Sequence, residues 1–291
     1  MSAVEQQPQP VEFWWGENFP TKVLLAVCRH TPFFRGKGRV FQWLAANLFG
    51  GKLHVRNSLG ARLRIDPTDY IGRTISFEGA FEPKSLARAT AIMRAGGVFL
   101  DIGCNIGLYT MPLGVLPGVE CIAIDCSFVA LAKFQENLVL NPQIKVYVVN
   151  TALCDENNLL CFKTPTGGNL GGTHVTDNHH YEGRASHFLV SGVALERVLE
   201  RLTPCGIKLL KIDVEGSEMS VFQGLDFNGP YRPENLIVEC YTELFPQAVA
   251  CFEFLQSKGY EAMTVEGKPI KECKDLPEVN VWFRSISERH L

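Results

Sequence analysis

The segment best suited to chemistry is the loop that follows an apolar run at residues 98–102, which predicts a buried strand. Asp101, Gly103, Asn105 and Gly107 stand there at alternate positions. Small turn residues let a ligand approach the backbone, and a helix that begins here offers free N–H groups. The dinucleotide fingerprint G-x-G-x-x-G is absent, which argues against a nicotinamide-dependent oxidoreductase. The carboxylate of Asp101 would instead suit a ligand that carries an ammonium group.

A second acidic residue, Asp125, ends the apolar strand expected at residues 120–125. In nucleotide-binding α/β folds, a carboxylate at this place accepts the hydroxyl groups of a ribose. The alternative is a structural role, in which Asp125 caps the next helix together with Ser127. We favour the ribose role because of the preceding loop. Three residues that follow the second and third strands are expected to complete the ligand site: Cys126, Thr151 and Ala152. Thr151 and Ala152 would contact the nucleobase of the ligand.

Three carboxylates stand where the strand expected at residues 208–214 meets the following helix: Asp213, Glu215 and Glu218. Ligands of open α/β sheets bind at this carboxyl edge. Glu239, near the end of the next strand, is expected at the same edge. Asp213, Glu215 and Glu239 are therefore the candidates for positioning or deprotonating a substrate.

The elements that must position these residues alternate between strand and helix, which is typical of a parallel sheet with crossover helices. The predicted fold class is therefore α/β, a doubly wound, Rossmann-like sheet that is mostly parallel and has an antiparallel final strand. Five parallel strands and a closing antiparallel pair are expected at residues 98–102, 120–125, 145–150, 208–214, 235–240, 261–264 and 279–283. Helices are expected at about residues 82–94, 107–115, 128–140, 218–224 and 246–258.

Residues 1–66 are expected to form an N-terminal extension of helices and a β-hairpin, and residues 67–291 the main domain. A flap at about residues 155–192 interrupts the alternation of the main domain and contains the glycine-rich block 167–172. Four of the seven histidines lie in or after this block, where a base over a substrate is one interpretation and a solvated loop is the favoured one. They are His174, His179, His180 and His187.

Four segments resemble the FkbM family of methyltransferases, in the family's order and near its usual spacings: residues 77–83, 101–110, 136–141 and 211–218. The resemblance covers about residues 65–240 and implies the class I methyltransferase fold. It also implies S-adenosylmethionine as the methyl donor, with S-adenosylhomocysteine as the product, and O-methylation of a sugar, a glycolipid or a secondary metabolite. The residues that it carries over to the site are Glu82, Asp101, Gly103, Asn105, Gly107, Asp125 and Asp213 with Glu215.

One departure from the family lies after the second strand. The family usually has Glu followed by Pro there, whereas this chain has Asp125 followed by Cys126. The shorter carboxylate still has the chemistry to accept bonds from ribose hydroxyls.

Transfer of a methyl group to a hydroxyl requires alignment of the two reactants and removal of the hydroxyl proton, which a carboxylate or a histidine can accept. A divalent ion such as Mg²⁺, held by Asp213 and Glu239, is a less favoured way to acidify the hydroxyl. The sequence leaves two other functions open. One is a catalytically silent methyltransferase fold that acts as a binding or scaffold protein, and the other is N- or C-methylation of a small molecule.

The chain of 291 residues has a formal net charge of −3, so its overall charge does not indicate a nucleic-acid partner. Residues 21–65, by contrast, contain nine basic residues and no acidic one. This basic and aromatic region has three interpretations: a solvated helical subdomain, a cap over the acceptor pocket, or a peripheral contact with anionic lipid. The cap would place four aromatic side chains around the acceptor: Phe33, Phe34, Phe41 and Trp43.

The ten cysteines show no C-x-x-C pair and no zinc spacing, which is typical of buried thiols in a reducing compartment. The N-terminal segment lacks the charged and apolar parts of a signal peptide. No apolar run approaches the roughly 20 residues of a membrane span. We therefore expect a cytoplasmic protein that acts on a small molecule. The sequence indicates no oligomeric state.

Overall fold

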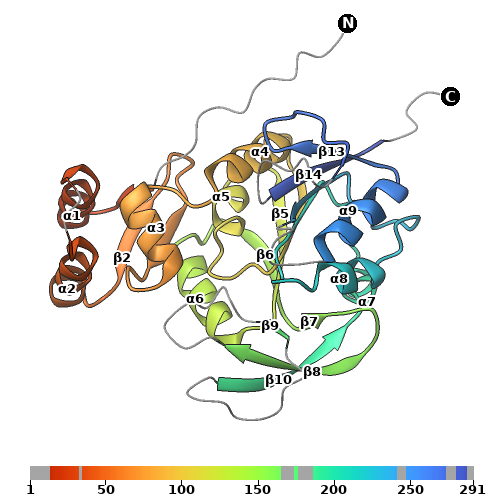
Figure 1. Cartoon of the computed structure of the whole chain (residues 1–291), viewed down its shortest axis with the longest axis horizontal. Coiled ribbons are helices and arrows are strands. Elements are labelled where there is room, and N and C mark those ends of the chain that lie inside the picture. The colour runs from red at the N-terminus through yellow and green to blue at the C-terminus, as the bar shows by residue number, and fades with distance from the viewer. Residues whose placement is uncertain are drawn as a thin grey trace, which may run out of the picture.

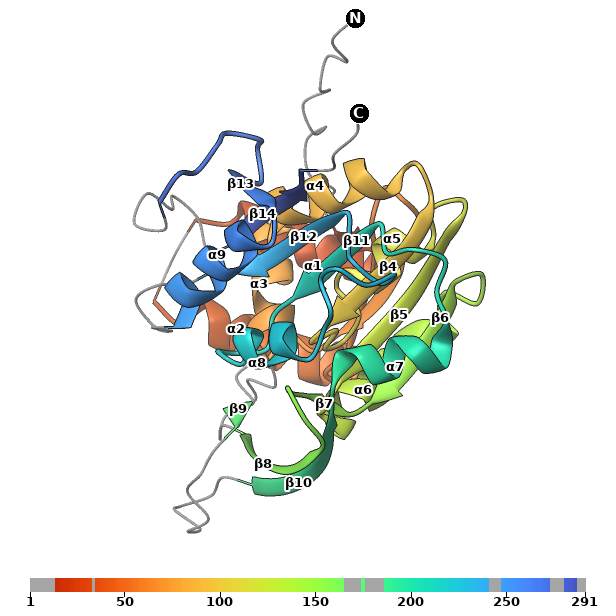
Figure 2. The same ribbon diagram turned by 90° about the vertical axis from the view of Figure 1, so that its right-hand side faces the viewer.

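A seven-stranded sheet forms the centre of the molecule in the computed structural model (Figures 1 and 2). The structure describes residues 14–32, 35–164, 174–175, 186–240, 247–272 and 280–286. Its strands are β4 (Gly97–Ile102), β5 (Val119–Asp125), β6 (Lys145–Asn150), β11 (Leu209–Ile212), β12 (Asn235–Glu239), β13 (Tyr260–Thr264) and β14 (Asn280–Ser285). They lie in the order β13-β14-β12-β11-β4-β5-β6. Every neighbouring pair from β12 to β6 is parallel, and β14 runs antiparallel between β12 and β13. The predicted doubly wound α/β fold with its antiparallel final strand is confirmed.

Different helices cover the two faces of this sheet. They are α4 (Pro83–Met93), α5 (Thr110–Gly114), α6 (Phe128–Val139), α7 (Leu195–Leu202), α8 (Glu218–Gln223) and α9 (Gln247–Ser257). Leu100 and Ile102 pack in one buried cluster with α7, α8 and α9, whereas Phe99 packs in another with α4 and α5. Because side chains alternate along a strand, Asp101 lies on the same face as Phe99. Within the described residues, no helix is both long enough and apolar enough to span a bilayer.

Strand β11 ends at Ile212, two residues earlier than the sequence predicted. The carboxylate Oε1 of Glu218 accepts hydrogen bonds from the backbone N–H groups of Val214 (3.1 Å) and Gly216 (3.3 Å), which holds the chain in a turn after the strand. Asp213 and Glu215 therefore lie in this turn and not in the strand.

Two helices also differ from the prediction. Helix α5 begins at Thr110 instead of residue 107, because Asn105 and Gly107 have φ angles of 48° and 90°, outside the right-handed helical region. Helix α7 was not predicted, although its buried Leu195, Val198 and Leu199 have helical spacing.

The N-terminal region forms α1 (Phe19–His30), α2 (Lys37–Phe49) and a three-stranded sheet, followed by α3 (Tyr70–Glu78). The sheet contains β1 (Trp15–Gly16), β2 (Leu53–Arg56) and β3 (Arg62–Ile65), and the last two form the predicted hairpin. Its buried side chains Leu53 and Leu63 belong to the same apolar cluster as Met111 of α5 and Phe134 of α6. The extension and the main domain thus share a core. Helices α1 and α2 lie at the outer end of the molecule (Figure 1).

Two asparagines connect the hairpin to α6. The side chain of Asn137 accepts a hydrogen bond from the Arg64 backbone N–H (2.7 Å) and donates one to the Ile106 carbonyl (2.9 Å). Asn141 accepts from the Arg62 backbone N–H at 2.9 Å. Both side chains are fully buried. The segment at residues 136–141, which carried part of the family resemblance, therefore has a structural role here.

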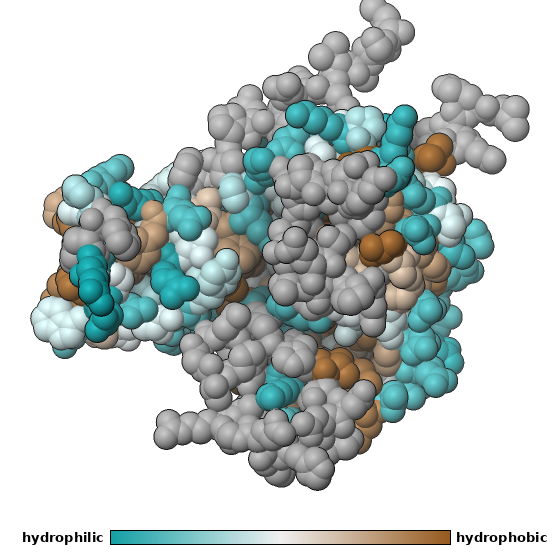
Figure 3. All heavy atoms as spheres, viewed as in Figure 1, coloured by the Kyte–Doolittle hydropathy of each residue, from teal (hydrophilic) through white to brown (hydrophobic). Residues whose placement is uncertain are grey.

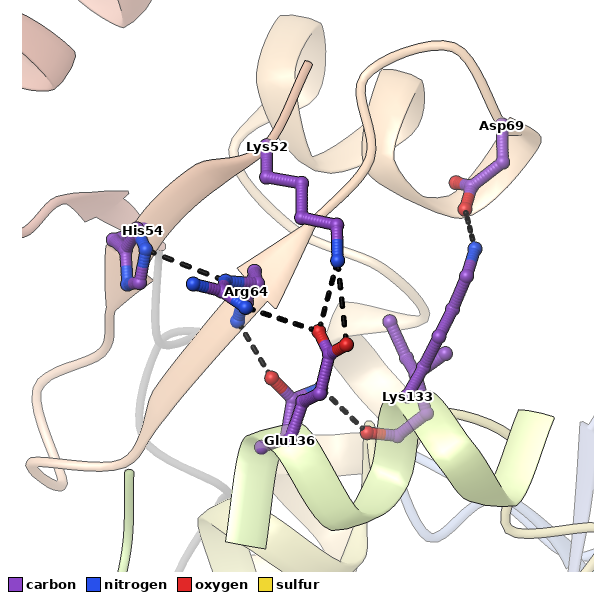
Figure 4. A network of polar contacts seen from close by, with 8 residues as sticks. Lys52, His54, Arg64, Asp69, Lys133 and Glu136 are labelled. Atoms are coloured by element: carbon purple, nitrogen blue, oxygen red, sulfur yellow. Dashed lines mark hydrogen bonds and ion pairs between the residues drawn. The ribbon is translucent and has the colours of Figure 1, made fainter. Parts of the chain in front are cut away.

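Ion pairs lie beside these bonds on the surface (Figure 4). Glu136 of α6 contacts Lys52 at 3.1 Å and Arg64 at 3.2 Å, and Lys133 contacts Asp69 at 3.3 Å. The two Glu136 pairs are exposed, and such pairs contribute about 1 kcal/mol or less to stability, whereas the Lys133–Asp69 pair is partly buried. The buried asparagines are therefore the stronger polar connection between the hairpin and the sheet domain.

Replacing Asn137 by alanine is expected to lower the free energy of unfolding by about 2 kcal/mol, because it leaves a buried N–H group and a buried carbonyl without partners. Urea denaturation of the full chain measures this loss. The matched control is Gln135→Ala on the exposed side of the same helix, which should change stability by less than about 0.5 kcal/mol. Equal stability of the two variants would contradict the assigned role of Asn137.

A small four-stranded sheet lies beside the central one and appears at the bottom of Figure 2. Its strands are β7 (Ala152–Leu153), β8 (Asn158–Thr164), β9 (His174–Val175) and β10 (Ser186–Val193), in the order β7-β10-β8-β9. The predicted flap thus contains an antiparallel hairpin of β8 and β10. The glycine-rich block at residues 167–172 lies outside the described residues.

Candidate active site

A cavity of about 510 Å³ lies at the carboxyl ends of β4, β5 and β11. The chain runs from β4 outward through β5 and β6, and then returns to the other side of β4 to form β11 and β12. Doubly wound sheets bind their ligands at such a switch point. Eleven of the twelve predicted site residues line the cavity: Glu82, Asp101, Gly103, Asn105, Asp125, Cys126, Thr151, Ala152, Asp213, Glu215 and Glu239.

Gly107 is the predicted site residue that does not line the cavity. A Cβ atom at this position would lie 2.8 Å from Met111 Cε and 3.2 Å from Phe134 Cδ2. Gly103 does line the cavity, but its Cβ atom would lie 1.9 Å from the carbonyl oxygen of Asp213. These glycines are thus required because other parts of the chain pack closely against them. The sequence analysis had instead expected a ligand to approach them.

Asp125 joins the two loops at one end of the cavity. Its carboxylate accepts hydrogen bonds from the backbone N–H groups of Asn105 and Ser127, each at 2.8 Å. Ser127 is itself the N-cap of α6, so the structural alternative weighed for Asp125 is present. Burial raises the pKa of Asp125, although the two backbone bonds oppose the shift. Each carboxylate oxygen retains a lone pair that can accept a hydrogen bond from a hydroxyl group of a ligand.

Asp101 forms the floor of the cavity next to this loop. Its carboxylate is buried and accepts a hydrogen bond from the Thr110 hydroxyl at 2.5 Å. Burial raises the pKa of Asp101 to about 6, against the opposing effects of Thr110 and of the Lys211 ammonium. A ligand cation in contact with Asp101 would favour its charged form. The geometry therefore suits the ammonium group that the sequence predicted for this place.

Lys211 is a central residue that the sequence analysis did not select. Its side chain is 2% exposed, and in the parallel sheet it stands directly opposite Asp101 of β4. The ammonium group donates a hydrogen bond to Asp213 at 3.3 Å and lies 5.3 Å from the centre of the Tyr109 ring. Burial alone would lower the pKa of Lys211, but Asp213, Glu82 and Glu239 together raise it above its ordinary value. Lys211 is thus a permanent cation among carboxylates.

Strained backbone gathers around the same cavity. Among the described residues, four non-glycine residues have a positive φ, and three of them line the cavity: Glu82 (43°), Asn105 (48°) and Glu215 (54°). Such conformations cost about 1–3 kcal/mol each and cluster at functional sites. The Glu82 carboxylate is fixed by the Tyr109 hydroxyl, which donates to it at 2.6 Å.

Two carboxyl groups at the ends of β11 and β12 have raised pKa values. Burial and the neighbouring Asp213 raise the pKa of Glu239 well above its ordinary value. Burial, Asp213 and Glu218 raise the pKa of Glu215 to about 7. A carboxylate with a pKa near the working pH is suited to general base catalysis. Glu215 is thus the member of this group that can gain and lose a proton most readily.

The small sheet supplies an aromatic wall of the cavity. Phe162 lines the cavity and stacks on Phe188 with ring centres 5.7 Å apart. Phe128 of α6 contacts Phe188 edge-on at 5.6 Å. The Thr151 hydroxyl donates a hydrogen bond to the carbonyl of Ser191, at 2.7 Å, which ties the small sheet to the loop after β6. No motif in the sequence indicated Phe162.

Other predicted participants do not reach this cavity. Phe41 is buried against Phe77, with ring centres 5.2 Å apart, and Trp43 is 63% exposed, so neither lines the cavity as a cap would. Helix α3 takes that place with Tyr70 and Ile71. His187 lies on β10 and is not among the lining residues. Four remaining candidates, and the side chain of His174, lie outside the described residues: Phe33, Phe34, His179 and His180.

A family model described as the methyltransferase FkbM domain matches residues 103–262 of the chain. The chain belongs to the FkbM methyltransferase family. The match begins in the loop at Gly103 and extends past Asp213, Glu215 and Glu239, so the family predicted from the sequence is confirmed. Glu82, Asp101 and the N-terminal region lie outside the matched residues.

Several solved methyltransferases resemble this member of the FkbM family at low sequence identity. A putative rRNA methylase from Clostridium thermocellum is 14% identical with a TM-score of 0.41, over 70% of this chain and 97% of that one. Precorrin-6y C5,15-methyltransferase from Geobacter metallireducens is 13% identical with a TM-score of 0.38, over 68% and 85%. TYW2 from M. jannaschii, in complex with AdoMet, is 11% identical with a TM-score of 0.39, over 81% and 87%. No curated protein matches the chain significantly.

Proposed function

We propose that this FkbM family member transfers the methyl group of S-adenosylmethionine to a hydroxyl group of a sugar, a glycolipid or a secondary metabolite. The observation that carries the proposal is Glu215, a cavity-lining carboxylate whose pKa is raised to about 7. A hydroxyl acceptor must lose its proton during transfer, and a carboxylate with this pKa can accept it at neutral pH.

The residues of the cavity fit the donor. Asp101 offers a buried carboxylate for the ammonium of its methionine part, and Asp125 offers acceptors for its ribose hydroxyls. Phe162 and the backbone at Thr151 and Ala152 offer an apolar place for its adenine. The volume of about 510 Å³ lies within the range of small-molecule sites. When bound, the donor would supply a methyl group made electrophilic by the adjacent sulfonium.

The chain's own contribution is to hold the acceptor and to remove its proton. Lys211 donates a hydrogen bond to Asp213 at 3.3 Å, which holds that carboxylate at the edge of the cavity, and Glu239 lines the same cavity. Asp213 can then accept a hydrogen bond from the acceptor and orient it. Glu215 takes the proton of the reacting hydroxyl on a carboxylate oxygen. Orientation of this kind supplies a large part of the rate in a displacement between two bound reactants.

Methyl transfer is tested with labelled S-adenosylmethionine and a panel of methyl glycosides, glycolipids and hydroxylated secondary metabolites, each paired with an amino analogue. Label in a hydroxyl compound supports the proposal, and label only in the amino analogues would indicate N-methylation. Binding of S-adenosylhomocysteine without turnover on any compound would indicate a scaffold function. Among the described residues no group of three His, Cys, Asp or Glu side chains is arranged to hold a metal ion, and assays with added Mg²⁺ or EDTA test the metal-assisted alternative.

Replacing Asp101 by asparagine is expected to weaken the binding of S-adenosylhomocysteine about thirtyfold, or about 2 kcal/mol, the typical value of a hydrogen bond to a charged group. Adenosine, which lacks the amino-acid part, should bind the variant and the wild type equally. Calorimetric titration of both ligands into both proteins measures the difference. An equal loss for the two ligands would show that the substitution disturbs the cavity as a whole.

A further inference from the structure

Helix α1 presents an apolar face to solvent. Phe19, Val23 and Val27 are 77%, 46% and 52% exposed. Their spacing of four residues places them on one side of the helix, while Leu24 and Cys28 are buried on the other side. The solvent face of a helix in a globular protein is normally polar. The exposed face of α1 is therefore suited to a partner that covers apolar side chains.

Helix α2 adds a second set of exposed apolar side chains. Val40, Trp43 and Leu48 are 49%, 63% and 67% exposed. Both helices lie at the outer end of the molecule, where Figure 3 shows hydrophobic and hydrophilic residues side by side. Neither helix contributes to the cavity, since the lining residues begin at Tyr70. We call these six side chains the apolar set. None of them lines the cavity, including Trp43, which the cap interpretation had placed around the acceptor.

Positive charge accompanies the apolar set. Other basic residues of the region face the protein: Arg62 pairs with Glu17, and the Arg29 guanidinium donates to the carbonyls of Trp14, Ile75 and Ser76. Three of the remaining basic residues lie on the outer faces of α1 and α2 or in the turn between them, next to the apolar set in the sequence. They are Lys22, Arg35 and Arg39, all exposed.

We propose that α1 and α2 dock on an anionic lipid bilayer, with the apolar set inserted at the interface and the basic side chains on the lipid headgroups. Interfacial helices combine these two features, and Phe and Trp are common at the boundary between acyl chains and headgroups. Each basic residue near such a surface adds to the attraction. This docking concerns a surface that does not line the cavity and does not depend on the proposed methyl transfer.

The charge and the apolar side chains together favour a bilayer over a second copy of the chain and over a nucleic acid. A second copy of the chain would bring its own basic α1 and α2 against the first, and like charges at an interface oppose association. A nucleic acid would satisfy the basic residues but would leave Val23, Val27, Val40 and Leu48 without an apolar partner. An anionic membrane satisfies both the charged and the apolar side chains.

The test is flotation of the full chain with vesicles of phosphatidylcholine alone and of phosphatidylcholine with phosphatidylserine. We expect binding to the anionic vesicles that weakens as salt is added, because salt screens the charges on both surfaces. Phe19→Ser combined with Trp43→Ser should weaken binding at least tenfold. Lys22→Gln combined with Arg39→Gln should remove the preference for phosphatidylserine.

The matched controls are Val139→Ser and Leu189→Ser, which remove apolar side chains that are 78% and 61% exposed on other surfaces. They should bind vesicles as the wild type does. Thermal unfolding and S-adenosylhomocysteine binding, unchanged in all variants, would show that each variant is folded. The proposal is overturned if the wild type does not float with anionic vesicles, or if the apolar variants float as well as the controls. It is also overturned if the wild type is a dimer in solution that the apolar variants dissociate.

Discussion

Replacing Glu215 by glutamine is expected to lower kcat for methyl transfer about a thousandfold, within the usual range for loss of a general base. The pKa of Glu215 is raised to about 7 by burial and by the charges of Asp213 and Glu218. Only the ionised carboxylate can accept a proton, so the wild-type rate should rise with pH up to about 7 and then level off. The residual rate of Glu215→Gln should not follow that curve.

Stability provides a control for this variant. The folded-state pKa of Glu215 lies above the ordinary value of 4.5, so the folded protein binds a proton more tightly there than the unfolded chain does. The stability from this group is present below the unfolded-state pKa and is lost as pH rises through about 7. Glu215→Gln should therefore unfold at or above the wild-type temperature at pH 8, although it is nearly inactive.

A second variant distinguishes a base from a residue that only shapes the loop. Glu215→Asp keeps a titrating carboxylate on a shorter side chain, so it should retain part of the activity and a rate that depends on pH. If Glu215→Gln keeps the wild-type kcat and the wild-type pH profile, Glu215 is not the base. Asp213, which accepts a hydrogen bond from Lys211, would then be the next candidate.

The donor end of the cavity was predictable because its signals are local. An apolar strand that ends in Asp101 and leads into Gly103 and Asn105 specifies a turn by its own residue types. Alternation along the chain then gave the parallel sheet and placed Asp125 beside that turn. These predictions needed no knowledge of which distant residues would meet.

Lys211 could not be selected in the same way. A lysine within an apolar run is a visible signal, since lysine is almost never fully buried unless it is paired. Its partners, however, come from Glu82 before α4, from Asp101 on β4 and from Glu239 on β12, and the sequence does not state that these meet. The end of the strand could not be predicted from the sequence either, because it depends on the hydrogen bonds that Glu218 accepts from the turn.

The N-terminal aromatic residues show the same limit. Phe41 and Trp43 are two positions apart on α2, and one of the three interpretations of the sequence placed both in a cap. One is 4% exposed and the other 63% exposed, because neighbours two apart on a helix face different directions. Only the packing of α2 on the rest of the region decides which of them is buried. The exposed one became part of the proposed lipid-binding surface.

Replacing Lys211 by methionine is expected to lower the free energy of unfolding at pH 8 by about 4 kcal/mol, the usual range when one partner of a buried ion pair is removed. The ammonium faces Asp213, Glu82 and Asp101, and without it their negative charges are uncompensated. Urea denaturation measures the loss. The matched control is Lys208→Met, just before the same strand, whose ammonium pairs with Glu234 at 2.6 Å on the surface. This control should lose about 1 kcal/mol or less.

The pH dependence identifies the cause of the loss. Without the cation, the carboxyl groups around residue 211 should have higher pKa values in the folded protein, since desolvation and like charge both disfavour ionisation. Groups with a raised folded-state pKa contribute stability at low pH that is lost as pH rises. The deficit of Lys211→Met should therefore be smaller at pH 5 than at pH 8. Adding Asp213→Asn to Lys211→Met should restore part of the stability at pH 8, because it removes one of the uncompensated charges. A deficit that is the same at every pH and unchanged in the double variant would mean that Lys211 acts through packing of its aliphatic stem instead of its charge.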